Sequence, residues 1–216
     1  MHEHSIHKEQ LLTTIDKQTI SSASQLNEAA LDLLFREARS FSFWQPRPVE
    51  ESVIRKLYDL LKFGPTSANT TPARFAFLTS DEAKARLVPL MPEMNREKTR
   101  SAPVVVLVAY DLKFYEKLDK LMPHRDYKPW FVGNPAYAEK TAKQSGTLQG
   151  AYLMLAARSL GLDCGPMLGN DDQINAEFFP DSSWRLNFVC ALGYGVKEKL
   201  FPRLPRLDFD EAALIL

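Results

Sequence analysis

A short polar loop between two apolar patterns carries the residues best suited to chemistry. Hydroxyl and amide side chains follow one another in this loop, at Thr66, Ser67, Asn69, Thr70 and Thr71. Such a loop can offer side-chain donors and free backbone N–H groups to an oxygen-rich ligand. The same residue types are common in helix caps and turns for local reasons, so the residues alone leave both interpretations open.

The elements on either side must position this loop. An amphipathic helix is predicted before it, with one apolar stripe made of Val53, Ile54, Leu57, Leu60 and Leu61. Gly64 stands where a left-handed C-terminal cap belongs, and Pro65 follows, where a helix cannot continue. After the loop, the apolar run from Phe75 to Leu78 is typical of a buried strand.

Basic residues near the two ends of the chain could provide a second kind of chemistry. Arg39 and Ser40 follow an amphipathic helix pattern from Leu26 to about Ala38, and Arg203 and Arg206 lie in the C-terminal segment. An arginine presents a bidentate fork to phosphate, and a serine adds one donor. Taken alone, the residues favour a plainer interpretation, in which Arg39 is a solvated cation that suits the dipole at a helix end.

Size and composition limit the classes of protein to consider. The chain has 216 residues, of which 45% are hydrophobic and 25% charged, and its formal net charge is zero. These values are ordinary for one soluble globular domain. The lack of a basic excess argues against a general nucleic-acid binder, although a local cationic pocket for one phosphate remains compatible with it.

Cysteine, histidine and apolar patterns give further expectations. Cys164 and Cys190 stand among apolar neighbours and belong to no Cys-x-x-Cys pair, so they are predicted to be core residues. Residues 1–25 are predicted to be a partly helical or disordered extension, in which three nearby histidines are not expected to hold a metal: His2, His4 and His7. No signal peptide or membrane span is found, and the cytoplasm is the expected location.

The remaining pattern predicts alternating helices and strands. A helix capped by Ser80 is expected to reach about Val88, followed by a loop that contains Pro and Met residues. Residues 103–109 are apolar on both faces and predict a central strand with helices on each side. A short helix over 111–122, a loop of aromatic and charged residues over 123–135, and a strand over 186–194 complete the pattern.

The longest helical pattern runs from Ala136 to Leu160 and ends at Gly161, which suits the C′ position. One predicted face consists of Leu148, Ala151, Tyr152 and Leu155. The other faces carry small residues, namely Ala142, Ser145, Gly146, Gly150, Ala156 and Ala157. A helix that is apolar or small all round should be buried on every side, and in a chain of this size that predicts a partner subunit.

Several of these segments resemble motifs of the nitroreductase family of flavin enzymes. Residues 64–72 are similar to its P-S-x-x-N-x-Q-P loop, with Thr71 in the place of the usual Gln. Residues 38–44 resemble R-R-S-x-R-x-F, with Ala38 and Ser42 in place of the outer arginines. Residues 161–170 resemble G-x-x-x-x-P-x-x-G-F, and residues 202–211 resemble P-R-x-R-x-P-L-x-E. The resemblance covers roughly residues 26–216.

The resemblance implies a fold and a cofactor. The implied fold is a single α+β domain over residues 26–216, a three-layer α-β-α arrangement with a mixed, mostly antiparallel sheet and a long central helix at a homodimer interface. The implied cofactor is flavin mononucleotide (FMN), with a backbone N–H near Gly169 reaching flavin N5. The positions that match the cofactor-binding motifs are Arg39, Ser40, Ser42, Pro65, Ser67, Asn69, Pro166, Met167, Gly169, Arg203 and Arg206.

The implied activity is ping-pong hydride transfer from NADH or NADPH to a small acceptor. Within the family, the chain looks like the malonic semialdehyde reductase (HadB/RutE-type) branch, which implies reduction of malonic semialdehyde to 3-hydroxypropanoate beside nitro compounds and quinones. Two alternatives stay open: a flavin-binding sensor or carrier without turnover, and a flavin-independent protein in which the loops are structural. The natural acceptor, the choice between NADH and NADPH, and the roles of residues 1–25 and 123–135 are not determined.

Overall fold

The computed structural model describes residues 25–216. The predicted extension, with its three histidines, therefore lies outside the described residues except for its last position. The chain divides into two compact units, residues 1–37 and 38–216. In the first, helix α2 (Glu28–Leu31) is capped by the Asn27 side chain and runs into a π-helical turn, η1 (Asp32–Arg36). The helix predicted from Leu26 to Ala38 is thus shorter at both ends.

The second unit is built on a four-stranded sheet. Its strands are β1 (Ala73–Leu78), β2 (Val104–Asp111), β3 (Asp163–Met167) and β4 (Trp184–Gly193), in the order β1-β2-β4-β3. All three strand pairs are antiparallel. A single parallel bridge joins Ser40 to Cys164 beside β3. The α+β class is therefore confirmed, with this bridge as the parallel element beside the four strands.

Strand β2 is buried along its whole length, as its apolar residues on both faces predicted. Its neighbours are β1 and β4, so it is a central strand. Strand β1 lies at an edge and is fully buried only at its two ends, Ala73 and Leu78, rather than throughout. The predicted strand over 186–194 is β4, which begins two residues earlier.

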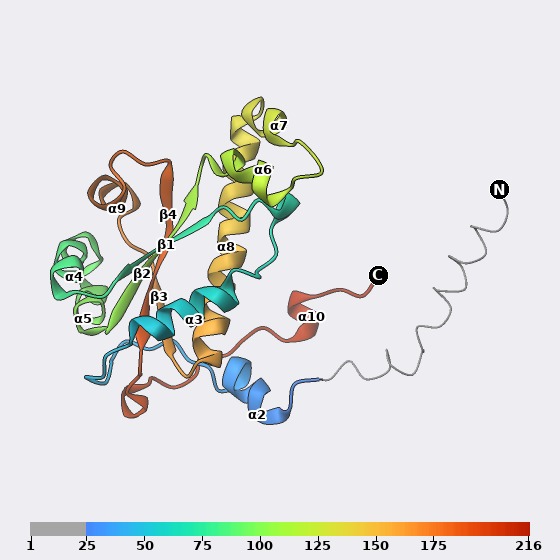
Figure 1. Cartoon of the computed structure of the whole chain (residues 1–216). Helices are drawn as coiled ribbons and strands as arrows, with labels where there is room; N and C mark the ends of the chain where they lie inside the picture. Colours follow the sequence, from blue (N-terminus) through green and yellow to red (C-terminus); the bar gives the residue numbers. More distant parts are fainter. Residues whose placement is uncertain (1–24) are drawn as a thin grey trace. The chain divides into compact units, whose positions relative to one another are not determined.

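Helices cover both faces of the sheet, which gives three layers (Figure 1). Helices α3 (Glu51–Leu61) and α8 (Pro135–Ser159) pack on one face. Helices α4 (Asp81–Leu87), α5 (Glu93–Ser101) and α9 (Asp171–Phe178) lie on the other. The shorter helical segments are η2 (Ser67–Asn69), η3 (Val88–Leu90), η4 (Phe114–Lys117), α6 (Leu118–Leu121), α7 (Lys128–Val132), η5 (Lys197–Lys199) and α10 (Phe209–Ala212).

Helix α8 packs on the sheet through its small residues. A Cβ atom at Gly150 would lie 2.5 Å from the Phe188 ring, and one at Gly146 would lie 3.1 Å from Tyr110 Cβ. The apolar face predicted from Leu148 and Tyr152 points outward instead, and Leu148 is 51% exposed. Small residues occupy the face of α8 that packs on the sheet, because they let the helix backbone approach the strands closely.

Two glycine assignments had different outcomes. Gly161 has a φ of 76° directly after α8, which confirms its left-handed cap. Gly64 is not among the left-handed residues, so its predicted role was wrong. A Cβ atom there would lie 3.0 Å from the Tyr152 ring, so close packing explains this glycine. The apolar stripe predicted for α3 was also too wide, because it included Leu60, which is exposed.

Helix α5 occupies the segment that was predicted to be a loop. Its sequence is almost entirely polar, so it lacks the apolar periodicity that reveals an amphipathic helix. It is nevertheless anchored by burial of Lys98 and Thr99. The segment over 123–135 likewise contains a helix, α7, whose Phe131 stacks edge-on against Phe114 with ring centroids 4.9 Å apart.

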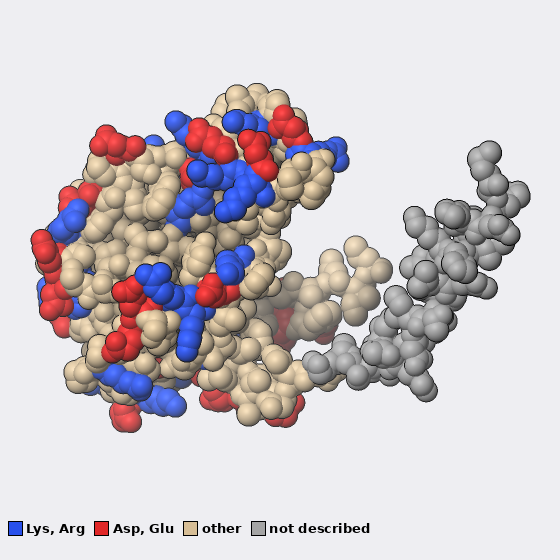
Figure 2. Space-filling view, viewed as in Figure 1, with Lys and Arg blue, Asp and Glu red and all other residues tan. Residues whose placement is uncertain are grey.

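Charged side chains of both signs are mixed over the face of the molecule drawn in Figure 2. This distribution agrees with the zero net charge of the whole chain. Among residues 25–216, no helix has the length and apolar character needed to cross a membrane.

Candidate functional site

Four arginines line one pocket of about 700 Å³ in the second unit. Three of them were predicted from the sequence, namely Arg39, Arg203 and Arg206, and Ser40 lines the same pocket. The fourth is Arg158, which lies at the C-terminal end of helix α8. A pocket with four guanidinium groups is suited to a dianionic ligand, because each group can donate charge-assisted hydrogen bonds to oxygen.

Reciprocal hydrogen bonds assemble this pocket from distant parts of the chain. Arg39 Nη2 donates to the carbonyl of Phe201, and Arg203 Nη2 donates to the carbonyl of Ala38 at 3.0 Å. Arg206 Nη1 donates to the carbonyls of Leu204 and Pro205 within its own segment. The two basic segments are therefore tied together before any ligand binds.

Sequence reasoning missed Arg158. Its signal was a basic residue in the last turn of the long helix, a position that is usually explained by the helix dipole. That signal is common to many helices and specifies no ligand. Only the fold shows that the C-terminal end of α8 faces the same pocket as the segments around Arg39 and Arg203.

Strand β3 starts beside this pocket and leads away from it. The Phe41 N–H donates to the Cys164 carbonyl at 2.9 Å, which places Ser40 and Arg39 next to the start of the strand. Strand β3 pairs with β4 along its other edge. Beyond the Ser40 bridge, residues 165–167 have β4 as their one strand partner in the described part of the chain.

A buried lysine lies against this edge strand. Lys98 of α5 is 7% exposed, and its Nζ donates to the Pro166 carbonyl at 3.4 Å. Burial lowers the pKa of the Lys98 ammonium below its ordinary value of 10.5, partly offset by the nearby Cys190 thiol. This residue was missed because helix α5 was missed. It places a cation behind the segment that includes Pro166.

The other predicted residues of this segment have structural partners of their own. Met167 is buried, and its sulfur accepts a hydrogen bond from the Thr99 hydroxyl at 3.8 Å. A Cβ atom at Gly169 would lie 2.4 Å from Ile174 Cδ1 and 3.1 Å from Met91 Sδ. A larger residue at position 169 would therefore force the end of the Ile174 side chain to move, whether or not a flat ring approaches it.

The polar loop lies apart from the arginine pocket of its own chain. The Ser67 N–H donates to Ser145 Oγ at 3.3 Å, whereas Arg158 lies 13 residues further along α8. At 1.5 Å per residue the two contacts are about 20 Å apart along the helix. Asn69 Nδ2 donates to the Leu121 carbonyl at 2.8 Å. The remaining predicted positions, Ser42 and Pro65, are exposed and line no part of the arginine pocket.

The residues that the structure describes contain no rival centre for metal or thiol chemistry. No group of three or more His, Cys, Asp or Glu side chains between residues 25 and 216 could hold a metal ion. Cys164 is buried, and its contact with the Cys190 thiol, followed by desolvation, raises its pKa well above the ordinary value. The prediction that Cys164 and Cys190 are core residues is confirmed by their burial.

The comparisons with known proteins agree with this geometry. The model of the nitroreductase family matches residues 35–194. The chain belongs to the nitroreductase family. A relative from Ralstonia nicotianae, provisionally named NADH dehydrogenase/NAD(P)H nitroreductase RSc1004, is 53% identical over 192 residues, covering 88% of this chain and 98% of its own. A similarly named relative from Stenotrophomonas maltophilia is 54% identical over 191 residues, covering 88% and 97%.

Solved structures of nitroreductase-like proteins share the fold. A provisionally named nitroreductase from Exiguobacterium sibiricum, solved in complex with FMN, superposes with a TM-score of 0.77 at 23% identity, covering 89% of this chain and 99% of its own. The protein ydfN from Bacillus subtilis superposes with the same TM-score at 18% identity, covering 88% and 100%. At these identities the likeness establishes the fold.

Proposed function

We propose that this nitroreductase is an FMN-dependent NAD(P)H oxidoreductase. The observation that carries the proposal is the pocket in which four arginines and Ser40 converge. Three of these arginines lie on motifs that resemble the phosphate-binding segments of the family. The donor set fits the dianionic phosphate of FMN, and β3 begins directly beside it, at the bridge between Ser40 and Cys164.

The rest of the cofactor would lie along β3. Strand β3 ends at Met167, and a fully extended chain from Cys164 to Gly169 would span at most about 16 Å, which accommodates a flavin ring beyond the phosphate. Pro166, Met167 and Gly169 would contact the ring, and Lys98 would place positive charge near its polar edge. Once bound, FMN would supply the redox chemistry, taking hydride from NADH or NADPH and passing it to an acceptor in a ping-pong cycle.

The protein itself would bind the cofactor, orient it and shield it from water. The arginines would hold the anionic end, because a buried or partly buried phosphate needs several donors. The buried Lys98 would favour the more negatively charged state of a ring placed against Pro166, by simple charge attraction. Outward-facing side chains of α3, of the turn after it and of α8 support a homodimer, since Leu60, Phe63, Leu148 and Tyr152 are all exposed.

A dimer built on this surface would also give the polar loop a role. Because Ser67 lies on Ser145 of α8, far from its own arginine pocket, it could contribute to the flavin held by the partner copy. Pro65, Ser67 and Asn69 remain proposed cofactor-binding residues on this basis. Ser42 is the least supported of the proposed set, because it is exposed and lines no part of the pocket.

The first experiment tests the cofactor and turnover together. The purified protein should be yellow with close to one FMN per chain, and NADPH or NADH should bleach the flavin absorbance rapidly in an anaerobic stopped-flow measurement. A colourless protein that does not take up added FMN would contradict the proposal. Flavin that binds but is not reduced would identify the alternative, a flavin-binding sensor or carrier.

We propose that the electron acceptor is a small oxidising molecule. Nitro compounds, quinones and malonic semialdehyde, which would be reduced to 3-hydroxypropanoate, are the three candidate classes. Reoxidation of the reduced protein by one compound of each class, followed at the flavin absorbance, ranks them by second-order rate constant. The semialdehyde reductase assignment fails if that aldehyde reoxidises the protein no faster than buffer alone.

A further inference from the structure

The loop over residues 66–71 has an unusual backbone. Ala68, Asn69 and Thr71 have φ values of 47°, 50° and 37°, a left-handed region that non-glycine residues rarely adopt. For Thr71 the conformation is especially unfavourable, because its side chain is branched at Cβ. Three such residues within four positions persist only if contacts around the loop hold them there.

Internal contacts hold the first half of the loop. Thr70 Oγ1 donates to the Ser67 carbonyl at 2.8 Å, and the Thr71 N–H donates to Thr66 Oγ1 at 3.1 Å. These contacts are short-range and partly buried, and Thr70 is fully buried. They stabilise the turn itself, while Ser67 and Asn69 attach it to Ser145 and to the Leu121 carbonyl.

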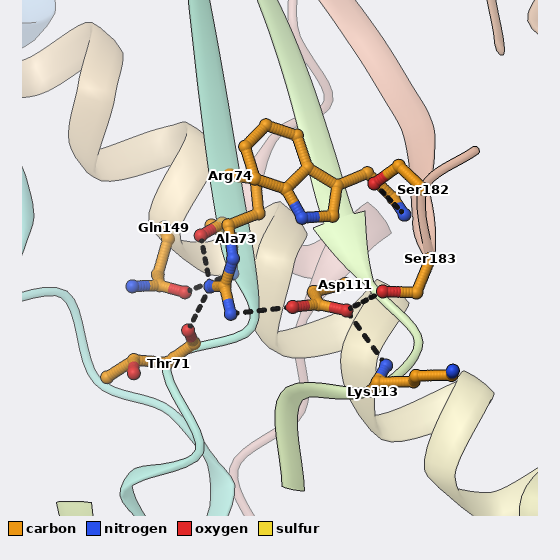
Figure 3. Close-up of polar contacts among 9 residues, drawn as sticks. Thr71, Ala73, Arg74, Asp111, Lys113, Gln149, Ser182 and Ser183 are labelled. Atoms are coloured by element: carbon orange, nitrogen blue, oxygen red, sulfur yellow. Dashed lines mark hydrogen bonds and ion pairs between the residues drawn. The ribbon is translucent and has the colours of Figure 1, made fainter. Parts of the chain in front are cut away.

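Arg74 connects the second half of the loop to the core (Figure 3). Its Nη1 donates to the carbonyls of Thr71 and Ala73, at 3.0 and 2.9 Å. The Ala73 N–H donates in turn to Gln149 Oε1 of α8 at 2.9 Å. The guanidinium therefore holds two carbonyls at the same time: that of Thr71, the most strained residue of the loop, and that of Ala73, the first residue of β1.

Asp111 fixes the orientation of that guanidinium. Arg74 Nη2 donates to Asp111 Oδ2 at 2.8 Å, and the Asp111 residue is only 7% exposed. The other oxygen, Oδ1, accepts from the Ser183 hydroxyl at 2.6 Å and from the Lys113 N–H at 2.9 Å. Figure 3 shows these partners converging from the start of β1, the end of β2 and the residues just before β4. A largely buried ion pair whose second carboxylate oxygen is also hydrogen-bonded contributes a fixed geometry more than net stability.

We propose that Arg74 is a positioning residue for cofactor binding, anchored by Asp111, which holds the loop over 66–71 in its left-handed conformation. The held conformation presents Ser67 and neighbouring polar groups to the flavin. The inference rests on the proposed function, because it takes this loop as a contact of the flavin. The clamp itself concerns the chain alone and is measurable without any cofactor.

The central variant is Arg74→Lys. Lysine keeps the charge that pairs with Asp111 but lacks the planar fork that serves two carbonyls and a carboxylate together. In cofactor-free protein, hydrogen exchange of the amides over 66–71 should become at least tenfold faster. The Kd for FMN should rise about tenfold. Unchanged loop exchange would overturn the proposal, as would faster exchange with an unchanged Kd in a wild type that binds FMN.

Arg86→Lys is the matched control. Arg86 also joins a carboxylate and a carbonyl, because its Nε donates to Glu177 Oε1 at 2.7 Å and its Nη2 to the Glu177 carbonyl at 3.2 Å, but it does so between α4 and α9, away from the loop. This variant should leave loop exchange and the FMN Kd within twofold of wild type. Equal effects of the two variants would overturn the proposal, because they would show a general response to loss of an arginine.

A rescue separates positioning from general loss of structure. Glycine adopts a φ near 37° without strain, so Arg74→Lys combined with Thr71→Gly should recover at least part of the lost FMN affinity. Failure of glycine to recover any affinity would overturn the proposal. If Arg74→Lys does not fold, Asp111→Asn serves as the second variant, with the same expected loop exchange and the same glycine rescue.

The outcomes also distinguish this inference from the proposed function. A wild type that never binds FMN would refute the proposed function and, with it, the assigned purpose of the clamp. In that case hydrogen exchange in Arg74→Lys would still report whether Arg74 holds the loop. A wild type that binds FMN while Arg74→Lys binds it equally well would refute this inference alone.

Discussion

Single side chains of this nitroreductase combine charge with burial at few positions. Lys98 is a buried cation behind β3, whereas the arginines of the proposed phosphate pocket lie near the surface. The Lys98 ammonium has lost its water of hydration, so its desolvation lowers the stability of the folded protein even without a ligand. The second group keeps much of its solvent and should matter chiefly when an anion arrives. Substitutions at the two kinds of site should therefore behave differently.

Replacement of Arg206 by alanine should weaken FMN binding without large loss of stability. Loss of a charge-assisted hydrogen bond costs about 1.5–3 kcal/mol, which corresponds to roughly a 10- to 150-fold increase in Kd. A fluorescence titration with FMN measures the Kd of the variant and of the wild type. Arg55→Ala is the control, because Arg55 is an exposed residue of α3 paired with Glu51, and it should leave the Kd unchanged. Equal Kd values in Arg206→Ala and wild type would place the phosphate elsewhere.

Lys98 should give the cofactor-free protein a distinctive dependence on pH. Its folded pKa is lowered, so between that value and 10.5 the unfolded chain binds more protons than the folded one. The free energy of unfolding should therefore rise with pH across this window. Urea unfolding of wild type and Lys98→Met should show this rise only in the wild type. The difference between the two proteins removes contributions from tyrosines and cysteines that titrate in the same range.

Gly169 allows the packing and flavin explanations to be separated. A Cβ atom would collide with Ile174, so Gly169→Ala should lower the free energy of unfolding of the cofactor-free protein by about 1–3 kcal/mol. Urea unfolding measures this loss. If stability is unchanged while the FMN Kd rises, the glycine serves the ligand rather than the packing against α9.

At the scale of elements, helix α8 connects both parts of the proposed site. It carries Ser145 near the polar loop and Arg158 at the arginine pocket, and its inner face approaches the sheet through glycine and alanine. This close approach lets Gln149 reach the backbone of β1. The position of α8 against the sheet therefore affects both the loop and the pocket.

Gly150→Ala tests this packing. A methyl group there would lie 2.5 Å from the Phe188 ring, so the helix or the ring must move. The expected loss of stability is about 1–3 kcal/mol, reduced by the better helix propensity of alanine. Gln144→Ala, at an exposed position of the same helix, is the comparison. A melting temperature of Gly150→Ala equal to that of wild type would show that the interface is looser than the structure indicates.

At the scale of the whole molecule, the outer apolar surface of α3 and α8 remains uncovered in one chain. Such a surface is unusual for a monomer of this size and favours a homodimer. Leu148→Glu would place a charge within that surface. Analytical ultracentrifugation should show a dimer for wild type and dissociation for the variant, with loss of FMN if two copies share the site.

Met94→Glu is the control for this experiment. Met94 is 87% exposed on α5, on the opposite face of the sheet, so a charge there should leave the sedimentation unchanged. A wild type that sediments as a monomer at micromolar concentration would refute the dimer. The loop around Ser67 would then lack the partner copy that its proposed role requires.

The sequence by itself determined the elements whose signals are local. Four features depend on residues close together in the chain: strand β2 with its two apolar faces, the Ser80 cap, the glycine that ends α8, and the basic motifs around Arg39 and Arg206. The same local reasoning failed at α5, whose polar sequence has no apolar period, and at Gly64, whose neighbour Tyr152 is distant in sequence.

The tertiary structure decided which distant residues meet. It brought Arg158 into the arginine pocket, buried Lys98 behind β3 and turned the small face of α8 inward. It also formed the clamp between Arg74 and Asp111 around a strained loop. The physical reason is that each of these features depends on long-range packing and on the loss of water around charge. Neither quantity is encoded in the spacing of residues along one segment.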